Sequence, residues 1–222
     1  MRWVFAVVCL CGLMGPVATA QTVQSWNEVD LAANWNRASF TLPMVIRLDT
    51  QLANPQLAAT GLLVDLPVAR HFIITPGYLF ADLPQSSTQV HVPLLAGSVV
   101  WHAGKFSLAD RNRVEKLYGY GTEPVRYRNR ILVDRPFGLS HRWHAFASDE
   151  VFWNLSNATW NQNRLQLGGG VRLSRAAFLD MYYLQRDASG GAVETRALGT
   201  TLRILLRPAR GEAVKLPQKA GE

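Results

Sequence analysis

The sequence predicts an all-β fold: an antiparallel up-and-down transmembrane β-barrel of about 10–12 strands, preceded by a cleaved N-terminal signal peptide. Three observations support this prediction. Apolar and polar residues alternate with a period of two over most of the chain, as in β-strands. The N-terminus has the features of an export signal. After it, no apolar stretch approaches the roughly 18 residues that indicate a membrane-spanning helix.

Residues 1–20 are predicted to be the signal peptide. Arg2 supplies a positive charge, Val4 to Met14 form an apolar run, and Ala18 and Ala20 are the small residues of a cleavage site. We therefore expect cleavage after Ala20.

Cys9 and Cys11 both lie in this segment, and neither follows the small residue of a lipoprotein signal. The mature chain would then have no cysteine, which excludes disulfides and thiolate sites. We expect one β-barrel domain at 21–206 and a disordered, basic polar tail at 207–222.

The strand prediction rests on repeated segments of about ten residues, in most of which apolar and polar residues alternate, separated by turn residues. These segments are 26–35, 40–49, 59–66, 72–80, 89–101, 106–117, 125–134, 142–153, 162–173, 176–186 and 195–206. An even number is usual for bacterial barrels, so we expect either ten strands without the segment at Trp26, or twelve with one not recognised.

In the first two segments the two sides are distinct. Val29 and Leu31 alternate with Glu28 and Asp30, and the run Leu42, Met44, Ile46 and Leu48 alternates with polar residues. Of the later segments, only 176–186 also has helical spacing. We predict a strand there because Leu179, Met181 and Tyr183 alternate with Asp180 and Tyr182, and aromatic residues favour strands.

The segment after Pro124 has the clearest alternation. Every second residue is arginine at Arg126, Arg128 and Arg130, and Ile131 and Val133 lie on the other side. In a soluble sheet the apolar side would face a core, whereas in a transmembrane barrel it would face lipid and the arginines would face the lumen. The signal peptide favours the second interpretation.

The connections also favour a barrel. Short turns are expected at Asn36, Pro67, Ala103, Gly138 and Arg175, and longer polar loops at Asn54, Gln85, Gly121, Asn157 and Gly190. Short turns at one end and longer loops at the other are typical of outer-membrane barrels. Aromatic residues near strand ends suggest interfacial girdles. They are Trp26, Trp35, Trp101, Trp143, Trp153, Trp160, Tyr78, Tyr118, Tyr127 and Tyr183.

Four motifs in this order resemble a known family. They are Arg111-Asn112-Arg113-Val114-Glu115, Arg126-Tyr127-Arg128-Asn129-Arg130, Glu150-Val151-Phe152, and Arg164 followed by Leu167-Gly168-Gly169-Gly170. The chain resembles the uncharacterised bacterial proteins grouped as domain of unknown function 2490, over nearly all of the mature chain. The resemblance implies an outer-membrane barrel and no assigned activity. Unlike many such barrels, the last segment ends in Arg207-Pro208 rather than in an aromatic residue.

The alternation places a set of charged residues in the lumen: Arg111, Arg113, Glu115, Arg126, Arg128, Arg130, Asp134, Glu150, Arg164 and Arg172, with Arg142 and His144 beside them. We expect these arginines and carboxylates to form a salt-bridged, structural interior. The alternative is a narrow pore that favours anions. A soluble periplasmic β-barrel carrier is the alternative architecture.

An outer-membrane hydrolase of lipids or peptides is a further alternative. His144, Ser148 and Glu150 would share one face of a strand and include the residue types of a catalytic triad, but a triad is defined by geometry. We predict no enzyme activity, no cofactor and no metal site. Gly168-Gly169-Gly170 lacks the context of a phosphate loop, so a bulge or close packing is expected.

The chain carries a formal net charge of +7. An exported chain would not meet nucleic acid, so we exclude that partner and expect bacterial outer-membrane lipids and the barrel insertion machinery instead. The oligomeric state is not predicted.

Overall fold

The computed structural model describes residues 23–138, 142–188 and 195–207. The predicted signal peptide lies outside these ranges, as does the predicted tail apart from Arg207. Within them the chain forms eleven strands and a short 3-10 helix, η2 (Pro84–Ser86). The strands are β1 (Val23–Trp35), β2 (Ala38–Leu48), β3 (Pro55–Ala69), β4 (Phe72–Leu83), β5 (Thr88–Ala103), β6 (Phe106–Lys116), β7 (Val125–Phe137), β8 (Trp143–Asn154), β9 (Thr159–Arg172), β10 (Ala177–Ala188) and β11 (Thr195–Arg207).

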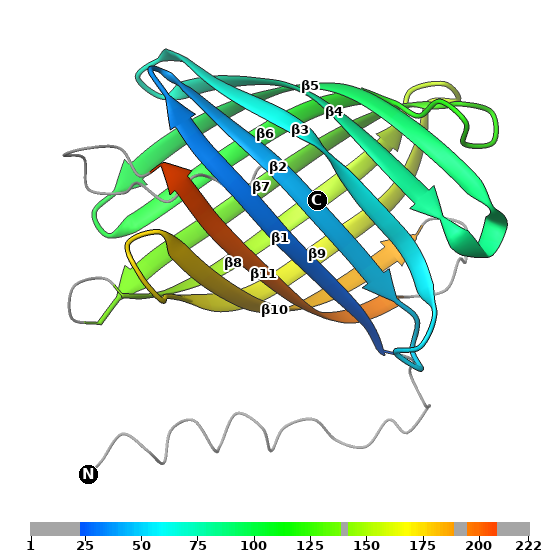
Figure 1. The fold of residues 1–222 in the computed structure, drawn as a ribbon. Coiled ribbons are helices and arrows are strands. Elements are labelled where there is room, and N and C mark those ends of the chain that lie inside the picture. Colours follow the sequence, from blue (N-terminus) through cyan, green and yellow to red (C-terminus); the bar gives the residue numbers. More distant parts are fainter. Residues whose placement is uncertain (1–22, 139–141, 189–194, 208–222) are drawn as a thin grey trace.

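These strands close into one barrel whose strand order follows the chain (Figure 1). Each strand pairs antiparallel with its neighbours in sequence, and β1 pairs parallel with β11 to close the wall. The structure confirms the predicted all-β barrel of about 10–12 strands; the described residues form eleven, so neither of the two even counts, ten or twelve, is met. The Trp26 segment belongs to the wall, and a parallel closing pair removes the requirement for an even number.

The connections have different lengths at the two ends of the barrel. At the short-turn end they contain two to five residues, at 36–37, 70–71, 104–105, 138–142 and 173–176. At the long-loop end they contain four to eight, at 49–54, 84–87, 117–124, 155–158 and 189–194. The turn expected at Pro67 lies at 70–71, because β3 continues past Pro67 through a shift in its pairing with β4.

The two faces of the wall differ as the alternation predicted. On β2, Phe40, Leu42 and Ile46 are exposed on the outside, whereas Thr41 is buried. The segment with competing helical spacing forms β10. Among the described residues, no helix is long and apolar enough to cross a bilayer.

Aromatic residues line the outer face near both ends of the strands. Trp35 and Trp101 lie at the short-turn end, and Trp153 and Trp160 pack edge to face at the long-loop end, with 6.5 Å between ring centres. Trp26 is an exception to the predicted girdle, because it faces the interior and is only 2% exposed.

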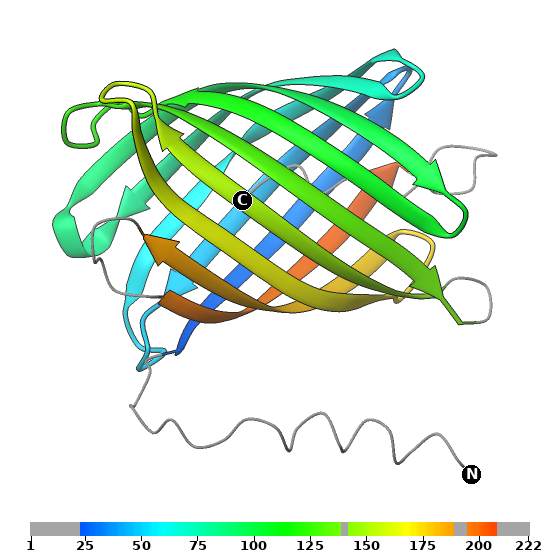
Figure 2. The ribbon, with the colours of Figure 1, turned by 180° about the vertical axis from the view of Figure 1, so that it is seen from behind.

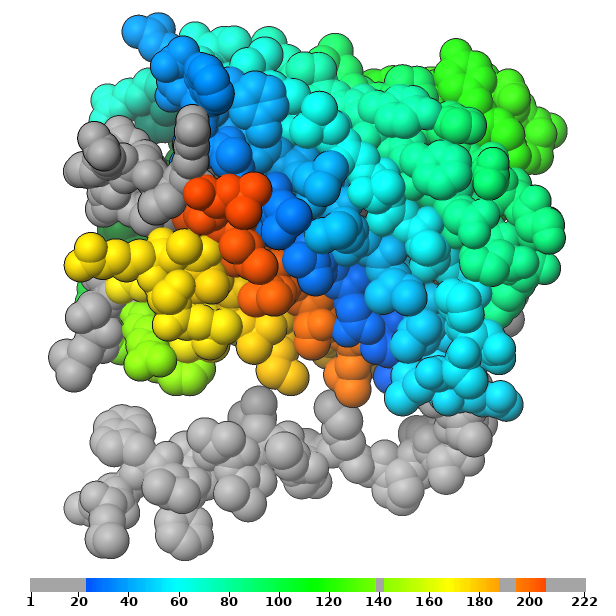
Figure 3. Space-filling view, in the orientation of Figure 1, coloured from blue at the N-terminus to red at the C-terminus, as the bar shows by residue number. Residues whose placement is uncertain are grey.

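Side chains from distant strands meet inside the barrel. Trp26 of β1 belongs to one buried cluster with Phe146 of β8, Tyr182 and Leu184 of β10, and Ala197 of β11. This cluster therefore fills the interior at the level of Trp26 with contacts between strands that are not all neighbours in the wall. On the outside, the side chains of β11 and β1 meet along the closing seam (Figure 3).

Candidate functional site

The candidate site is a buried ionic network on the inner face of β6 to β9. These are the green to yellow strands at the front of Figure 2. Its centre is Glu150 of β8, which is 2% exposed. Arg128 of β7 approaches Glu150 with two nitrogen atoms: Nε donates to Oε1 at 3.1 Å and Nη2 donates to Oε2 at 2.9 Å. This fork geometry is the strongest arrangement of an arginine–carboxylate pair.

Two more arginines bind the same carboxylate. Arg111 of β6 donates from Nη2 at 3.0 Å, and Arg164 of β9 lies 3.4 Å away through Nη1. Glu150 thus joins four adjacent strands through its two oxygen atoms. Such strands carry their arginines inward because the period of two keeps every second side chain on one face.

Glu115 of β6 is the second acidic centre. It forms ion pairs with Arg113 at 2.6 Å, with Arg126, and with Arg128 Nη1 at 3.5 Å. Arg128 therefore bridges both carboxylates. Since a buried charge is costly unless it is paired and hydrogen-bonded, this sharing is what allows so many charges to lie inside the wall.

Aromatic rings complete the network. The guanidinium carbon of Arg128 lies 4.6 Å from the centre of the Phe152 ring, and that of Arg164 lies 4.9 Å from it. Arg164 also lies 5.1 Å from the centre of the Trp26 ring. These distances are within the range of attractive cation–π contacts, so the rings take the place of water around the cations.

A second polar cluster lies nearer the short-turn end. His144 of β8 is hydrogen-bonded through Nδ1 to Asp134 of β7 at 2.6 Å, and through Nε2 to Asp180 of β10 at 2.9 Å. Gly170 of β9 lies between β8 and β10, and a Cβ there would lie 2.1 Å from Asp180 Oδ1 and 2.3 Å from His144 Nε2. The glycine tract therefore serves close packing, one of its two predicted roles.

All ten residues predicted to line the lumen lie on the inner face. Seven of them are buried, namely Arg111, Arg113, Glu115, Arg128, Arg130, Glu150 and Arg164. Arg126, Asp134 and Arg172 are half-buried on the same face. Arg142 is exposed just before β8 and lies outside the network.

The hydrolase candidates share the inner face of β8 but have different partners. Ser148 Oγ donates to Gln166 Oε1 at 3.1 Å, whereas His144 contacts Asp134 and Asp180, and Glu150 contacts arginines. His144 and Ser148 are four residues apart on one extended strand, a separation of roughly 13 Å. The structure does not bring them together as a serine–histidine pair. Among the described residues, no group of His, Cys, Asp and Glu could hold a metal ion.

Residues 23–193 match the family described as protein of unknown function (DUF2490). The chain belongs to this family. The match confirms the resemblance that the four motifs indicated, and family membership brings no assigned activity. No curated protein matches the chain.

Several interior residues of this DUF2490 chain were not singled out from the sequence. Asp30 of β1 lies 3.6 Å from Arg203 of β11 across the closing seam, and Asp65 of β3 accepts a hydrogen bond from Thr75 of β4 at 2.6 Å. Asp180 is a further example. The alternation places all of them on the inner face, but their partners depend on strand register, which the sequence does not reveal.

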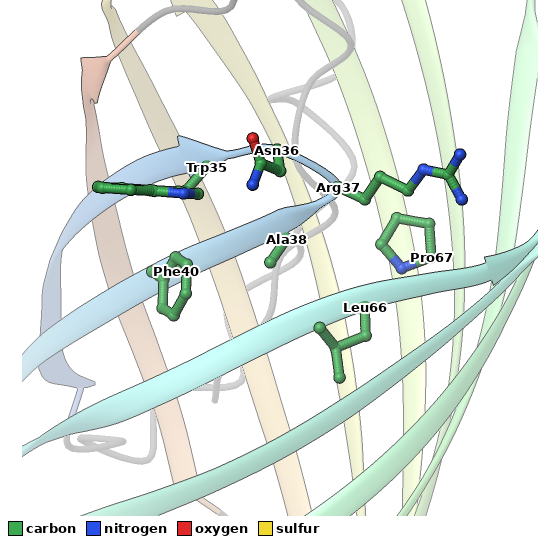
Figure 4. A pocket seen from close by; sticks show the side chains of 7 residues that line it. All are labelled: Trp35, Asn36, Arg37, Ala38, Phe40, Leu66 and Pro67. Carbon is green, nitrogen blue, oxygen red and sulfur yellow. The ribbon is translucent and has the colours of Figure 1, made fainter.

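A groove of about 300 Å³ lies on the outer surface at the short-turn end. It is formed where the β1–β2 turn approaches the end of β3 (Figure 4), and its lining is Trp35, Asn36, Arg37, Ala38, Phe40, Leu66 and Pro67. It is remote from the ionic network, because its residues come from the outside of the wall and from a turn.

Proposed function

We propose that this DUF2490 barrel spans the bacterial outer membrane and acts as a structural barrel whose interior is closed by the arginine–glutamate network. The observation that carries this proposal is the inversion of polarity across the wall. Large apolar side chains are exposed on the outside, among them Leu62, Leu95 and Met181, whereas Glu115, Glu150 and Arg113 inside are exposed by only 1–2%.

The outer surface supports the membrane location. Exposed apolar patches of this extent are rare on water-soluble monomers, and hydrocarbon is the medium that suits them. The aromatic residues near both ends of the strands are those expected at the bilayer interfaces.

The interior supports the closed state. Glu115, Glu150 and Arg128 are 5% exposed or less, so water reaches little of the network's centre. Trp26 and Phe152 fill the space beside the arginines. A continuous aqueous channel would leave such residues hydrated.

Two measurements test this proposal. Cell fractionation should place the protein in the outer membrane, where it should show heat-modifiable migration on electrophoresis. In planar bilayers, the purified barrel should give no steady conductance. A mature protein that is monodisperse in water without detergent would contradict the membrane assignment.

A narrow anion-favouring pore is the second candidate. Five arginines (Arg111, Arg113, Arg126, Arg128 and Arg164) pair with two glutamates, so the network has an excess of positive charge. A positive lining favours anions. This function requires an anion-selective conductance that falls in Arg128→Ala, and a silent wild-type barrel excludes it.

We propose that lipids and the barrel insertion machinery are the partners of this protein and that it has no enzyme activity. Lipid mass spectrometry on cells with wild-type protein and with Ser148→Ala tests the second point. A lipid product that disappears only in the variant would contradict it.

A further inference from the structure

The outer face of β6 to β9 carries a polar patch between the aromatic ends of these strands. Two rows of residues form it, each following the pairing across four strands. The first row is Asp110, Ile131, Asp149 and Leu165, and the second, two positions nearer the long-loop end, is Asn112, Asn129, Val151 and Asn163. The name polar patch is used below for Asp110, Asn112, Asn129, Asp149 and Asn163.

Hydrogen bonds link these side chains along the surface. Asn129 Nδ2 donates to Asp110 Oδ1 at 2.6 Å and to Asn112 Oδ1 at 3.1 Å. Asn163 Nδ2 donates to Asp149 Oδ1 at 2.9 Å. Among the described residues, the second oxygen of Asp110 and of Asp149 accepts no hydrogen bond.

The residues around the patch show that it lies on the outer surface. Ile131, between the two aspartates, is 47% exposed, and Leu165, beside Asp149, is 43% exposed. Asp149 itself is exposed, whereas Ser148 and Glu150 on either side of it are buried. In the proposed membrane location, two carboxylates would therefore face hydrocarbon, where a charged group is unfavourable.

We propose that the polar patch is the interface between two copies of this chain in the membrane. The inference rests on the proposed membrane location, because in water the patch would need no cover. Lipid tails offer no hydrogen bonds, whereas a second copy brings the same set of carboxylate acceptors and amide donors.

The geometry of the two rows makes the patch complementary to itself. Transmembrane strands are tilted by about 35–45°, so rows that run across them are inclined to the membrane plane. A two-fold axis along the membrane normal reverses this slope in the facing copy. The rows of the two copies therefore slope in opposite directions where the copies face each other. On each side of the axis, the row with Asp110 and Asp149 in one copy crosses the row with the asparagines in the other. An isologous contact of this kind is the usual form of a homodimer.

Cysteine cross-linking tests the interface. In a chain with Cys9→Ala and Cys11→Ala, a single cysteine replaces either Ile131 at the centre of the patch or Leu62 on the outer face of β3. Leu62 is the matched control, because both positions are 47% exposed. Treatment of membranes with copper phenanthroline should give a covalent dimer for Ile131→Cys and none for Leu62→Cys.

Removal of the polar groups from the patch provides a second test of the interface. Asp110→Leu combined with Asp149→Leu suits a lipid-facing wall, so the barrel should still insert, and native mass spectrometry in detergent should show loss of the dimer. Thr60→Leu, a polar-to-apolar change on the outer face of β3, should leave the dimer intact.

The outcomes separate this inference from the proposed function. A membrane-embedded protein that is monomeric, that cross-links equally at both cysteines, or that shows a lipid adduct at the patch instead of a dimer overturns the interface. A dimer that survives the double aspartate change also overturns it. A mature protein that is soluble without detergent contradicts the membrane assignment instead.

Discussion

The guanidinium carbon of Arg164 lies 5.1 Å from the centre of the Trp26 ring, although β10 and β11 separate β9 from β1 in the wall. The contact therefore crosses the inside of the barrel. It joins the ionic network of one wall to the buried Trp26 cluster of the other. Stability and closure of the interior are expected to depend on the same few side chains.

Glu150→Gln should destabilise the barrel strongly. The change removes the negative charge that Arg111, Arg128 and Arg164 share, and breaking a buried ion pair by removing one partner costs about 3–5 kcal/mol. Urea unfolding in lipid vesicles, followed by tryptophan fluorescence, measures this loss. Glu123→Gln, the same chemical change in an exposed loop, should have little effect. Equal effects of the two changes would contradict the central role of Glu150.

Trp26→Ala should lower the free energy of unfolding by about 3–5 kcal/mol, because it removes a large side chain from a filled interior. It should also weaken the closure and produce a conductance that the wild-type barrel lacks. Trp101→Ala on the outer face, where Trp101 is 44% exposed, is the control for tryptophan loss. A Trp26→Ala barrel as stable and as silent as wild type would argue against a plug that includes this residue.

Gly170→Ala should separate His144 from Asp180, because the added Cβ would overlap both side chains. Overpacking of this kind costs about 1–3 kcal/mol of stability. The adjacent Gly169→Ala is the matched control, since its Cβ would lie on the opposite face with its nearest neighbour, the His144 carbonyl oxygen, at 3.1 Å. The difference between the two variants in urea unfolding measures the effect. Its absence would show that the cluster tolerates the extra methyl group.

Asn54→Ala should raise the pKa of Asp49 in the loop between β2 and β3. The Asn54 side chain donates to Asp49 Oδ2 at 2.8 Å and is the main cause that lowers the pKa of this carboxyl below its ordinary value. Because the pKa is lowered in the folded state, the stabilising contribution is present above the unfolded pKa and is lost as the pH falls through the folded pKa. NMR titration of Asp49 measures the change.

Gln51→Ala is the control for this titration, because Gln51 contacts Asp49 through its backbone nitrogen rather than its side chain. A pKa of Asp49 that is the same in Asn54→Ala and in wild type would contradict the assignment.

Much of the fold could be predicted from the alternation alone. Arg126, Arg128 and Arg130 point inward and Ile131 and Val133 point outward, because a strand presents successive side chains to opposite faces. The same reasoning assigns Asn112 and Asn129 to the outside, so the polar patch was accessible from the sequence. It was not recognised because its two rows become continuous only after β6 to β9 are paired in register.

The partners of the interior residues could not be predicted in this way. Arg164 meets Trp26 only because the wall closes on itself, and His144 meets Asp180 only because Gly170 lies between their strands. The position of Trp26 near the start of a strand suggested an interfacial girdle, yet Trp26 shares one face of β1 with Glu28 and Asp30 and therefore points inside. For this residue, the face of the strand on which it lies was a better guide than its position along the strand.

The parallel pairing of β1 with β11 has a consequence for topology. Val23 starts the wall at the long-loop end, whereas Arg207 completes it at the short-turn end. In a bilayer the first and the last residue of the wall would therefore lie on opposite sides of the membrane. A reporter fused ahead of Val23 and another fused behind Arg207 would sample different compartments. In a barrel with an even number of antiparallel strands, both reporters would lie on the same side.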